Sequence, residues 1–163
     1  MENQLFAVAE KVGQLLISKG HKLVTAESCT GGWVAKVITD IAGSSDWFDC
    51  GFVTYSNTSK DQLLGVPRST LSEYGAVSKQ TVQKMVAGAL RNSAAQCALA
   101  VSGIAGPDGG SEGKPVGTVW FAWQQSDGKA VTALEYFSGN RIEIRRQAVK
   151  RAFEGVLNIY TPK

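Results

Sequence analysis

The sequence has 163 residues, of which 44% are hydrophobic, and this is enough for one globular domain with a sizeable core. Its formal net charge of +3 lacks the dense basic stripe that is typical of a nucleic-acid surface. Three cysteines without CxxC spacing and a single histidine argue against a disulfide framework or a metal site. We therefore expect a single domain over residues 1–163 that binds no nucleic acid and no metal.

The first twenty residues place leucines and valines at helical spacing, which predicts an amphipathic helix over residues 3–19 rather than a secretion signal. No apolar run approaches the roughly 18 residues that a membrane span requires. We therefore expect a cytoplasmic protein without a membrane contact.

Strands and helices alternate after this first helix. In chain order we predict a strand at 21–26, a helix from about Thr30, a strand at 50–56, a short helix at 57–65 capped by Asn57, a helical piece from Pro67, a long helix from Ser78 to Asn92, a strand at 97–103, a hairpin of 116–125 and 130–137, and a helix at 141–160 capped by Asn140. This order is typical of a three-layer α/β/α sandwich with a mixed, mostly parallel sheet.

In such sheets, ligands bind beyond the carboxyl ends of the strands. Candidate functional residues follow three predicted strands, in the loops 27–32, 55–60 and 102–110. The last of these loops begins the glycine-rich segment "GIAGPDGGSEGKP", which matches neither the dinucleotide-binding nor the P-loop pattern. Its glycines would let backbone N–H groups approach a phosphate or carboxylate, and a flexible turn is the alternative explanation.

Arg141 and Arg145 lie in the first two turns of the predicted last helix. The helix dipole disfavours cations at that end, so their position favours an anionic partner. A solvated surface explains the two arginines as well.

The segment "TAESCTGG" places Ser28 in a tight turn between a strand and a helix, where backbone N–H groups would stabilise an oxyanion. The same residues also fit a simple helix cap. His21 stands at the other end of the strand, roughly 16 Å away at 3.3 Å per residue, which argues against a Ser-His-Asp triad. Cys29 should point away from its neighbour and pack inward.

A lysine held neutral is the remaining common partner for a catalytic serine. Lys60 in "TYSNTSK" begins a helical stretch after the adjacent strand, and both burial and the positive helix end would lower its pKa. Tyr55 leaves the same strand and could relay a proton. A solvated lysine and a core tyrosine are the ordinary alternatives.

Six segments of the sequence, in this order and spacing, resemble the CinA C-terminal domain family over nearly the whole chain. They are "TAESCTGG", "GFVTYSNTSK", "GAVS", "SGIAGPDGG", "KPVGTVWFA" and "SGNRIEIRRQA". The family often has threonine where this chain has Ser102, which keeps the hydroxyl.

The resemblance implies hydrolysis of the amide of nicotinamide mononucleotide (NMN) to nicotinate mononucleotide and ammonia, a recycling step for pyridine nucleotides that needs no metal or other cofactor. It also implies a homodimer. Carried over by motif, Ser28 is the nucleophile, Lys60 its partner and Tyr55 an assisting residue. The substrate-binding residues that we expect are Thr30, Gly31, Gly32, Ser102, Gly103, Gly106, Gly109, Gly110, Arg141 and Arg145.

Three other functions remain open from the sequence. A catalytically silent nucleotide-binding module would be free to lose Ser28, Tyr55 or Lys60, and all three are present. An amidase or esterase for another small substrate would act without requiring a substrate phosphate. Direct DNA binding is suggested only by the family's name and would show a steep salt dependence.

Overall fold

Five strands form one sheet in the computed structural model, which describes residues 2–161. The elements are α1 (Glu2–Lys19), β1 (Leu23–Glu27), α2 (Trp33–Thr39), the 3-10 turn η1 (Ser44–Asp46), β2 (Phe48–Val53), α3 (Asn57–Leu64), α4 (Arg68–Tyr74), α5 (Lys79–Arg91), β3 (Cys97–Gly103), β4 (Thr118–Gln125), β5 (Val131–Tyr136) and α6 (Arg141–Tyr160). None of the helices within 2–161 is both long and apolar enough to cross a membrane.

The strand order is β2-β1-β3-β4-β5. β1 pairs in parallel with β2 and β3, whereas β4 is antiparallel to both β3 and β5, so only β4 runs against the others. Glu27 at the end of β1 pairs with Val53 of β2 and Val101 of β3. The three parallel strands therefore end side by side, and the loops after them share one edge of the sheet.

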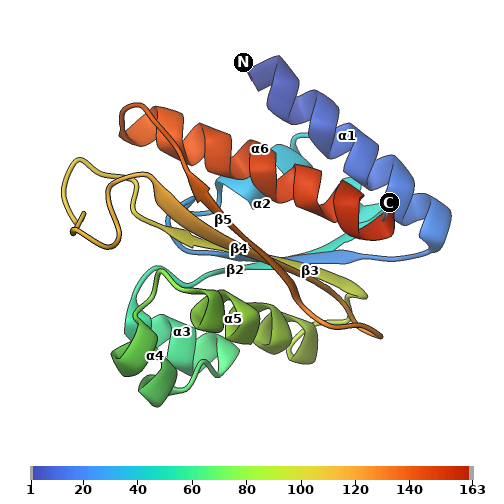
Figure 1. The fold of residues 1–163 in the computed structure, drawn as a ribbon. Coiled ribbons are helices and arrows are strands. Elements are labelled where there is room, and N and C mark those ends of the chain that lie inside the picture. Colours follow the sequence, from blue (N-terminus) through green and yellow to red (C-terminus); the bar gives the residue numbers. More distant parts are fainter. Residues whose placement is uncertain (1, 162–163) are drawn as a thin grey trace.

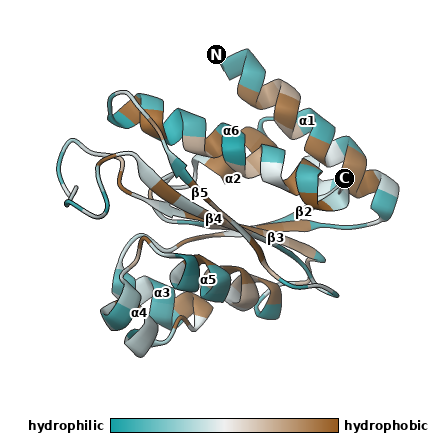
Figure 2. Ribbon diagram, in the orientation of Figure 1, coloured by the Kyte–Doolittle hydropathy of each residue, from teal (hydrophilic) through white to brown (hydrophobic). Residues whose placement is uncertain are grey.

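Helices α1, α2 and α6 cover one face of the sheet, and α3, α4 and α5 cover the other (Figure 1). Figure 2 shows hydrophobic residues alternating with hydrophilic ones along α1 and α6, the pattern of amphipathic helices. All five residues of β1 are buried, with Leu23 in the cluster under α1, α2 and α6 and with Val24 and Ala26 in the opposite cluster. This two-sided burial confirms the predicted three-layer sandwich with its mixed, mostly parallel sheet.

Several predicted boundaries are wrong by a few residues. β2 ends at Val53 rather than at residue 56, and α2 begins at Trp33 rather than near Thr30. The cap of α3 is Ser56, not Asn57, because the Ser56 hydroxyl accepts a hydrogen bond from the Ser59 N–H at 3.0 Å. The predicted Asn140 cap of α6 is confirmed as a reciprocal capping box with Glu143.

Candidate active site

The side chains of Ser28 and Lys60 meet at the shared edge of β1 and β2. Lys60 Nζ lies 2.8 Å from Ser28 Oγ, 2.8 Å from the Thr54 carbonyl oxygen and 3.1 Å from the Tyr55 carbonyl oxygen. Ser28 follows β1 directly, and its N–H donates to the Val101 carbonyl of β3. The proximity of this serine and lysine, predicted from the sequence, is thus present in the structure.

The position of Lys60 follows from the first turns of α3. Its backbone N–H donates to the Ser56 carbonyl, so Lys60 lies one turn into the helix. Side chains on a helix tilt toward its N-terminus, and that tilt carries the ammonium group back toward the end of β2. There it reaches the two carbonyl oxygens and Ser28.

Lys60 is fully buried. Within residues 2–161, no ion pair between Lys60 and a carboxylate is recorded. Burial disfavours the charged ammonium and lowers the pKa of Lys60 from 10.5 to about 8. At pH 7, roughly a tenth of the molecules then carry a neutral amine, against roughly 1 in 3,000 at the ordinary pKa. The predicted alternative of a solvated lysine is therefore wrong.

A cavity of about 240 Å³ opens beside the Ser28–Lys60 pair. It lies at the sheet edge where β1, β2 and β3 end, and the loop before α5, the glycine-rich loop and the start of α6 complete its wall. Its lining residues are Ser28, Cys29, Tyr55, Lys60, Ala76, Val77, Ser102, Gly103, Ala105 and Arg141. The cavity therefore combines a serine hydroxyl, a lysine of lowered pKa and one guanidinium group.

The ring of Tyr55 lies at the rim of this cavity, and 64% of the residue is exposed, so the core-tyrosine alternative is wrong. Its hydroxyl oxygen is 3.5 Å from Arg141 Nη2, while Arg141 Nη1 donates to the Gly106 carbonyl at 2.7 Å. The part of Tyr55 that contacts Lys60 is its backbone carbonyl. Arg141 thus ties the rim of the cavity to the glycine-rich loop.

Seven of the residues expected to bind substrate do not line the cavity, namely Thr30, Gly31, Gly32, Gly106, Gly109, Gly110 and Arg145. Gly109 and Gly110 are exposed on the outer part of their loop, and a Cβ on Gly106 would overlap the Val116 side chain. The need for glycine at residue 106 is therefore explained by packing within the loop.

Two of these seven residues shape the turn that carries Ser28. Arg145 Nε donates to the Cys29 carbonyl and Arg145 Nη2 to the Thr30 carbonyl, each at 3.0 Å, while its guanidinium lies over the Trp33 ring. The Thr30 hydroxyl is buried and donates to the Glu27 carboxylate at 2.6 Å. Sequence reasoning missed Glu27, although an acidic residue just before a helix start is a known signal for a group that receives N–H donors.

Cys29 is packed inward and His21 lies far from Ser28, as the sequence predicted for these two other candidates. Cys29 is 6% exposed, and burial raises the pKa of its thiol to about 12, which keeps it protonated. His21 lies at the opposite end of β1, where its Nδ1 is 2.7 Å from the Tyr160 hydroxyl. Across residues 2–161, no group of three or more His, Cys, Asp or Glu side chains is arranged to hold a metal ion.

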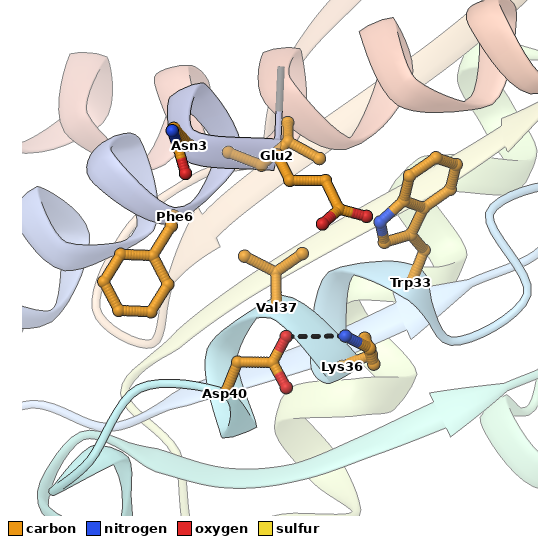
Figure 3. Close-up of a pocket in the computed structure, with 8 residues that line it drawn as sticks. Glu2, Asn3, Phe6, Trp33, Lys36, Val37 and Asp40 are labelled. Atoms are coloured by element: carbon orange, nitrogen blue, oxygen red, sulfur yellow. Dashed lines mark hydrogen bonds and ion pairs between the residues drawn. The ribbon is translucent and has the colours of Figure 1, made fainter.

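A second cavity, of about 180 Å³, lies between α1 and α2 (Figure 3). Glu2, Asn3 and Phe6 of α1 face Trp33, Val37 and the Lys36–Asp40 ion pair of α2. Both charged groups of that pair are solvent-exposed, so neither is activated by burial. The cavity beside Ser28 is the candidate active site because Ser28 and Lys60 both line it.

The sequence model of the CinA C-terminal domain matches residues 5–160. The chain belongs to the CinA C-terminal domain family. Within it, the chain is 56% identical to the nicotinamide-nucleotide amidohydrolase PncC of Escherichia coli, over 94% of this chain and 93% of that protein. It is 49% identical to the protein of the same name from Pseudomonas putida, over 94% and 96%.

Solved structures of the CinA family share this fold. The competence/damage inducible protein CihA from Agrobacterium tumefaciens superposes with a TM-score of 0.94 at 43% identity, covering 97% of this chain and 96% of its own. A competence damage-inducible protein A from Klebsiella pneumoniae superposes with a TM-score of 0.92 at 38% identity, covering 98% and 99%. These likenesses confirm the family predicted from the six sequence segments.

Proposed function

We propose that this protein hydrolyses the carboxamide of NMN, giving nicotinate mononucleotide and ammonia, through an acyl-enzyme on Ser28. The observation that carries the proposal is the 2.8 Å contact between Ser28 Oγ and a buried lysine whose pKa is lowered to about 8. The names of the PncC relatives from Escherichia coli and Pseudomonas putida supply the substrate. An amide is a demanding substrate for a serine, so the serine needs a base.

The neighbours of Lys60 Nζ suit a neutral amine that acts as that base. A neutral amine has two N–H bonds and one lone pair, whereas the carbonyl oxygens of Thr54 and Tyr55 can only accept. If the two N–H bonds are directed to these carbonyls, the lone pair is left for the hydroxyl proton of Ser28. The same three contacts would also satisfy an ammonium, so burial, which lowers the pKa of Lys60 to about 8, is what favours the neutral amine as acceptor of the Ser28 proton.

The reaction then proceeds in two halves. Ser28 Oγ attacks the carboxamide carbon as its proton passes to Lys60, and the resulting ammonium protonates the departing nitrogen, which leaves as ammonia. Water attacks the acyl-enzyme while neutral Lys60 removes a proton from it. The proton returns from Lys60 to Ser28 Oγ, which restores the starting state, and the carboxylic acid product loses its own proton to solvent and leaves as the carboxylate.

The substrate is held by groups that reach the same cavity. Arg141 is the guanidinium in its lining, and we assign it to the 5'-phosphate of NMN because Arg pairs with phosphate through two parallel hydrogen bonds. The Ser102 hydroxyl and Gly103 line the wall beside Ser28. The exposed Gly109 and Gly110 lie outside this wall, so we expect no contact between them and the reacting amide.

The test is ammonia release from NMN by the purified protein, with Ser28→Ala beside it and a chelator present throughout. We expect activity that survives the chelator and falls at least about 1,000-fold in Ser28→Ala. Full activity in Ser28→Ala would exclude the mechanism. Measurable NMN binding without any hydrolysis would instead indicate a silent nucleotide-binding module.

Dependence on the phosphate separates NMN from other small amides. We expect nicotinamide riboside, which lacks the phosphate, to show a reduced kcat/KM that Arg141→Ala does not reduce further. Equal kcat/KM for the two substrates would favour a general amidase. The cytoplasmic location and the homodimer stay predictions, which fractionation and light scattering would test.

A further inference from the structure

The carboxylate of Glu27 is fully buried next to Ser28, yet it makes no recorded hydrogen bond to Ser28 or Lys60. Residues alternate across a strand, so Glu27 lies on the same face of β1 as Leu23, the face covered by α2 and α6. A carboxylate is tolerated in such a place only when hydrogen bonds satisfy both its oxygens. Its partners therefore show what it holds in place.

Four donors converge on this carboxylate, and all come from the next eight residues. Oε1 accepts from the Thr30 hydroxyl at 2.6 Å and from the N–H groups of Gly32 at 3.2 Å and Val34 at 2.9 Å. Oε2 accepts from the Ala35 N–H at 3.1 Å. Glu27 thus takes the place of the capping side chain that Gly32 lacks, and the turn 28–32 wraps around it.

Arg145 holds the same turn through its carbonyl groups, those of Cys29 and Thr30. The C=O of Cys29 and the N–H of Thr30 belong to one trans peptide and point in opposite directions, so the Thr30 N–H points away from Arg145. Within residues 2–161 the N–H groups of Cys29 and Thr30 have no recorded hydrogen-bond partner, whereas the Ser28 N–H donates to the Val101 carbonyl. Glu27 and Arg145 therefore hold the turn from two sides without using these two N–H groups.

We propose that Glu27 is a positioning residue for amide hydrolysis. Its carboxylate keeps the turn 28–32 in the shape that places Ser28 Oγ next to Lys60 Nζ. This inference rests on the proposed function of Ser28. Because Glu27 does not line the cavity, it acts on the chemical step and not on substrate binding.

The variant Glu27→Gln tests the proposal with a small change in shape. Its amide oxygen can serve the three donors of Oε1, but its NH2 group then faces the Ala35 N–H and cannot accept from it. The turn must shift to relieve that conflict. We expect kcat for NMN to fall roughly 10- to 100-fold with KM unchanged within about threefold, since small misplacements of a nucleophile have effects of this size.

Thr30→Val removes one of the four donors at nearly constant volume, and we expect a smaller fall in kcat that Thr30→Ser rescues. Glu143→Gln is the matched control, because Glu143 also caps a helix with its carboxylate, but on α6. We expect its kcat to equal that of the wild type. Unchanged kcat per folded Glu27→Gln molecule, with only a lower Tm, would overturn the proposal.

Labelling of Ser28 by a fluorophosphonate keeps this inference separate from the proposed substrate. Ser28 Oγ forms the P–O bond, fluoride leaves, and the proton goes to Lys60. Slower labelling of Glu27→Gln than of the wild type supports the positioning role of Glu27, whether or not NMN is hydrolysed. Absence of NMN hydrolysis by a wild type that is labelled would overturn only the proposed function. Equal labelling rates overturn the positioning role, and a wild type that is neither labelled nor active overturns both.

Discussion

Each end of β1 carries a polar cluster, fully buried at Lys60 and partly buried at His21, and only one of the two is arranged for proton transfer. At the carboxyl end, Lys60 contacts Ser28 beside an open cavity. At the amino end, His21 contacts the Tyr160 hydroxyl, which lies near the buried thiol of Cys97. By residue type alone, a cysteine and a histidine are the more familiar catalytic pair.

Burial acts on both clusters and has opposite chemical results. It raises the pKa of Cys97 to about 12 and raises that of Tyr160, so both groups keep their protons and are poor nucleophiles. It lowers the pKa of Lys60 to about 8, and the neutral form of a lysine is a base. Burial therefore makes a thiol less nucleophilic and an amine more available as a base, because in each case the uncharged form is favoured.

Replacing Lys60 with methionine should give the largest effect. We expect Lys60→Met to lower kcat/KM at least about 1,000-fold, since the variant has no base for Ser28. The folded-state pKa of Lys60 lies below its unfolded value, so the charged lysine destabilises the fold below pH 8, and this effect disappears as the pH rises from about 8 to 10.5. Lys60→Met should therefore have a higher Tm than the wild type at pH 7.

Thermal unfolding at pH 7 and at pH 10, with kinetics on the same samples, checks both effects. The advantage of Lys60→Met in Tm should shrink at the higher pH. An inactive variant with a lower Tm at pH 7 would mean that the lysine contributes packing and hydrogen bonds that outweigh its desolvation.

The pH dependence of the wild-type enzyme should follow the Lys60 proton. Below pH 8, kcat/KM for NMN should rise about tenfold per pH unit and then level off near the pKa of about 8. His21→Gln should leave this profile unchanged, because His21 lies at the far end of β1. A profile that is altered in His21→Gln would place the working base at the amino end of β1.

Much of the Ser28–Lys60 pair could be predicted from the sequence, because its placement depends on local patterns. The strands before Ser28 and Lys60 are apolar runs followed by helix starts, and adjacent parallel strands bring the two loops together. The burial of Lys60 follows from its place one turn into α3. These features need only the order of elements and the tilt of side chains along a helix.

The partners of the turn 28–32 could not be predicted in the same way. Two arginines at a helix start indicated an anion, and the groups that Arg145 meets are the carbonyl oxygens of Cys29 and Thr30, 115 residues or more away in the chain. The hydroxyl of Thr30 indicated a cap or a ligand contact, and its partner is Glu27. The sequence identifies the donor groups, but the acceptor of each donor is determined by the tertiary fold.

The cluster at the amino end should affect stability and not catalysis. His21→Ala removes the contact to the Tyr160 hydroxyl, which joins the start of β1 to the end of α6. We expect a loss of about 1 kcal/mol in the free energy of unfolding, the usual size for one partly buried hydrogen bond, with kcat/KM unchanged. Urea unfolding of the variant and the wild type measures the first quantity. A loss of activity without a loss of stability would show that the two ends of β1 are coupled.

The smallest expected effect concerns Cys29, the neighbour of Ser28 in the wall of the cavity. Its pKa of about 12 leaves a thiolate fraction of roughly 10⁻⁵ at pH 7, and the thiolate is the form that iodoacetamide alkylates. We expect iodoacetamide at pH 7 to leave the activity unchanged and to react, if at all, at the half-buried Cys50. Peptide mapping identifies the alkylated thiol. Rapid alkylation of Cys29 with loss of activity would contradict the expectation that burial keeps a thiol protonated and unreactive, here at the residue directly after Ser28.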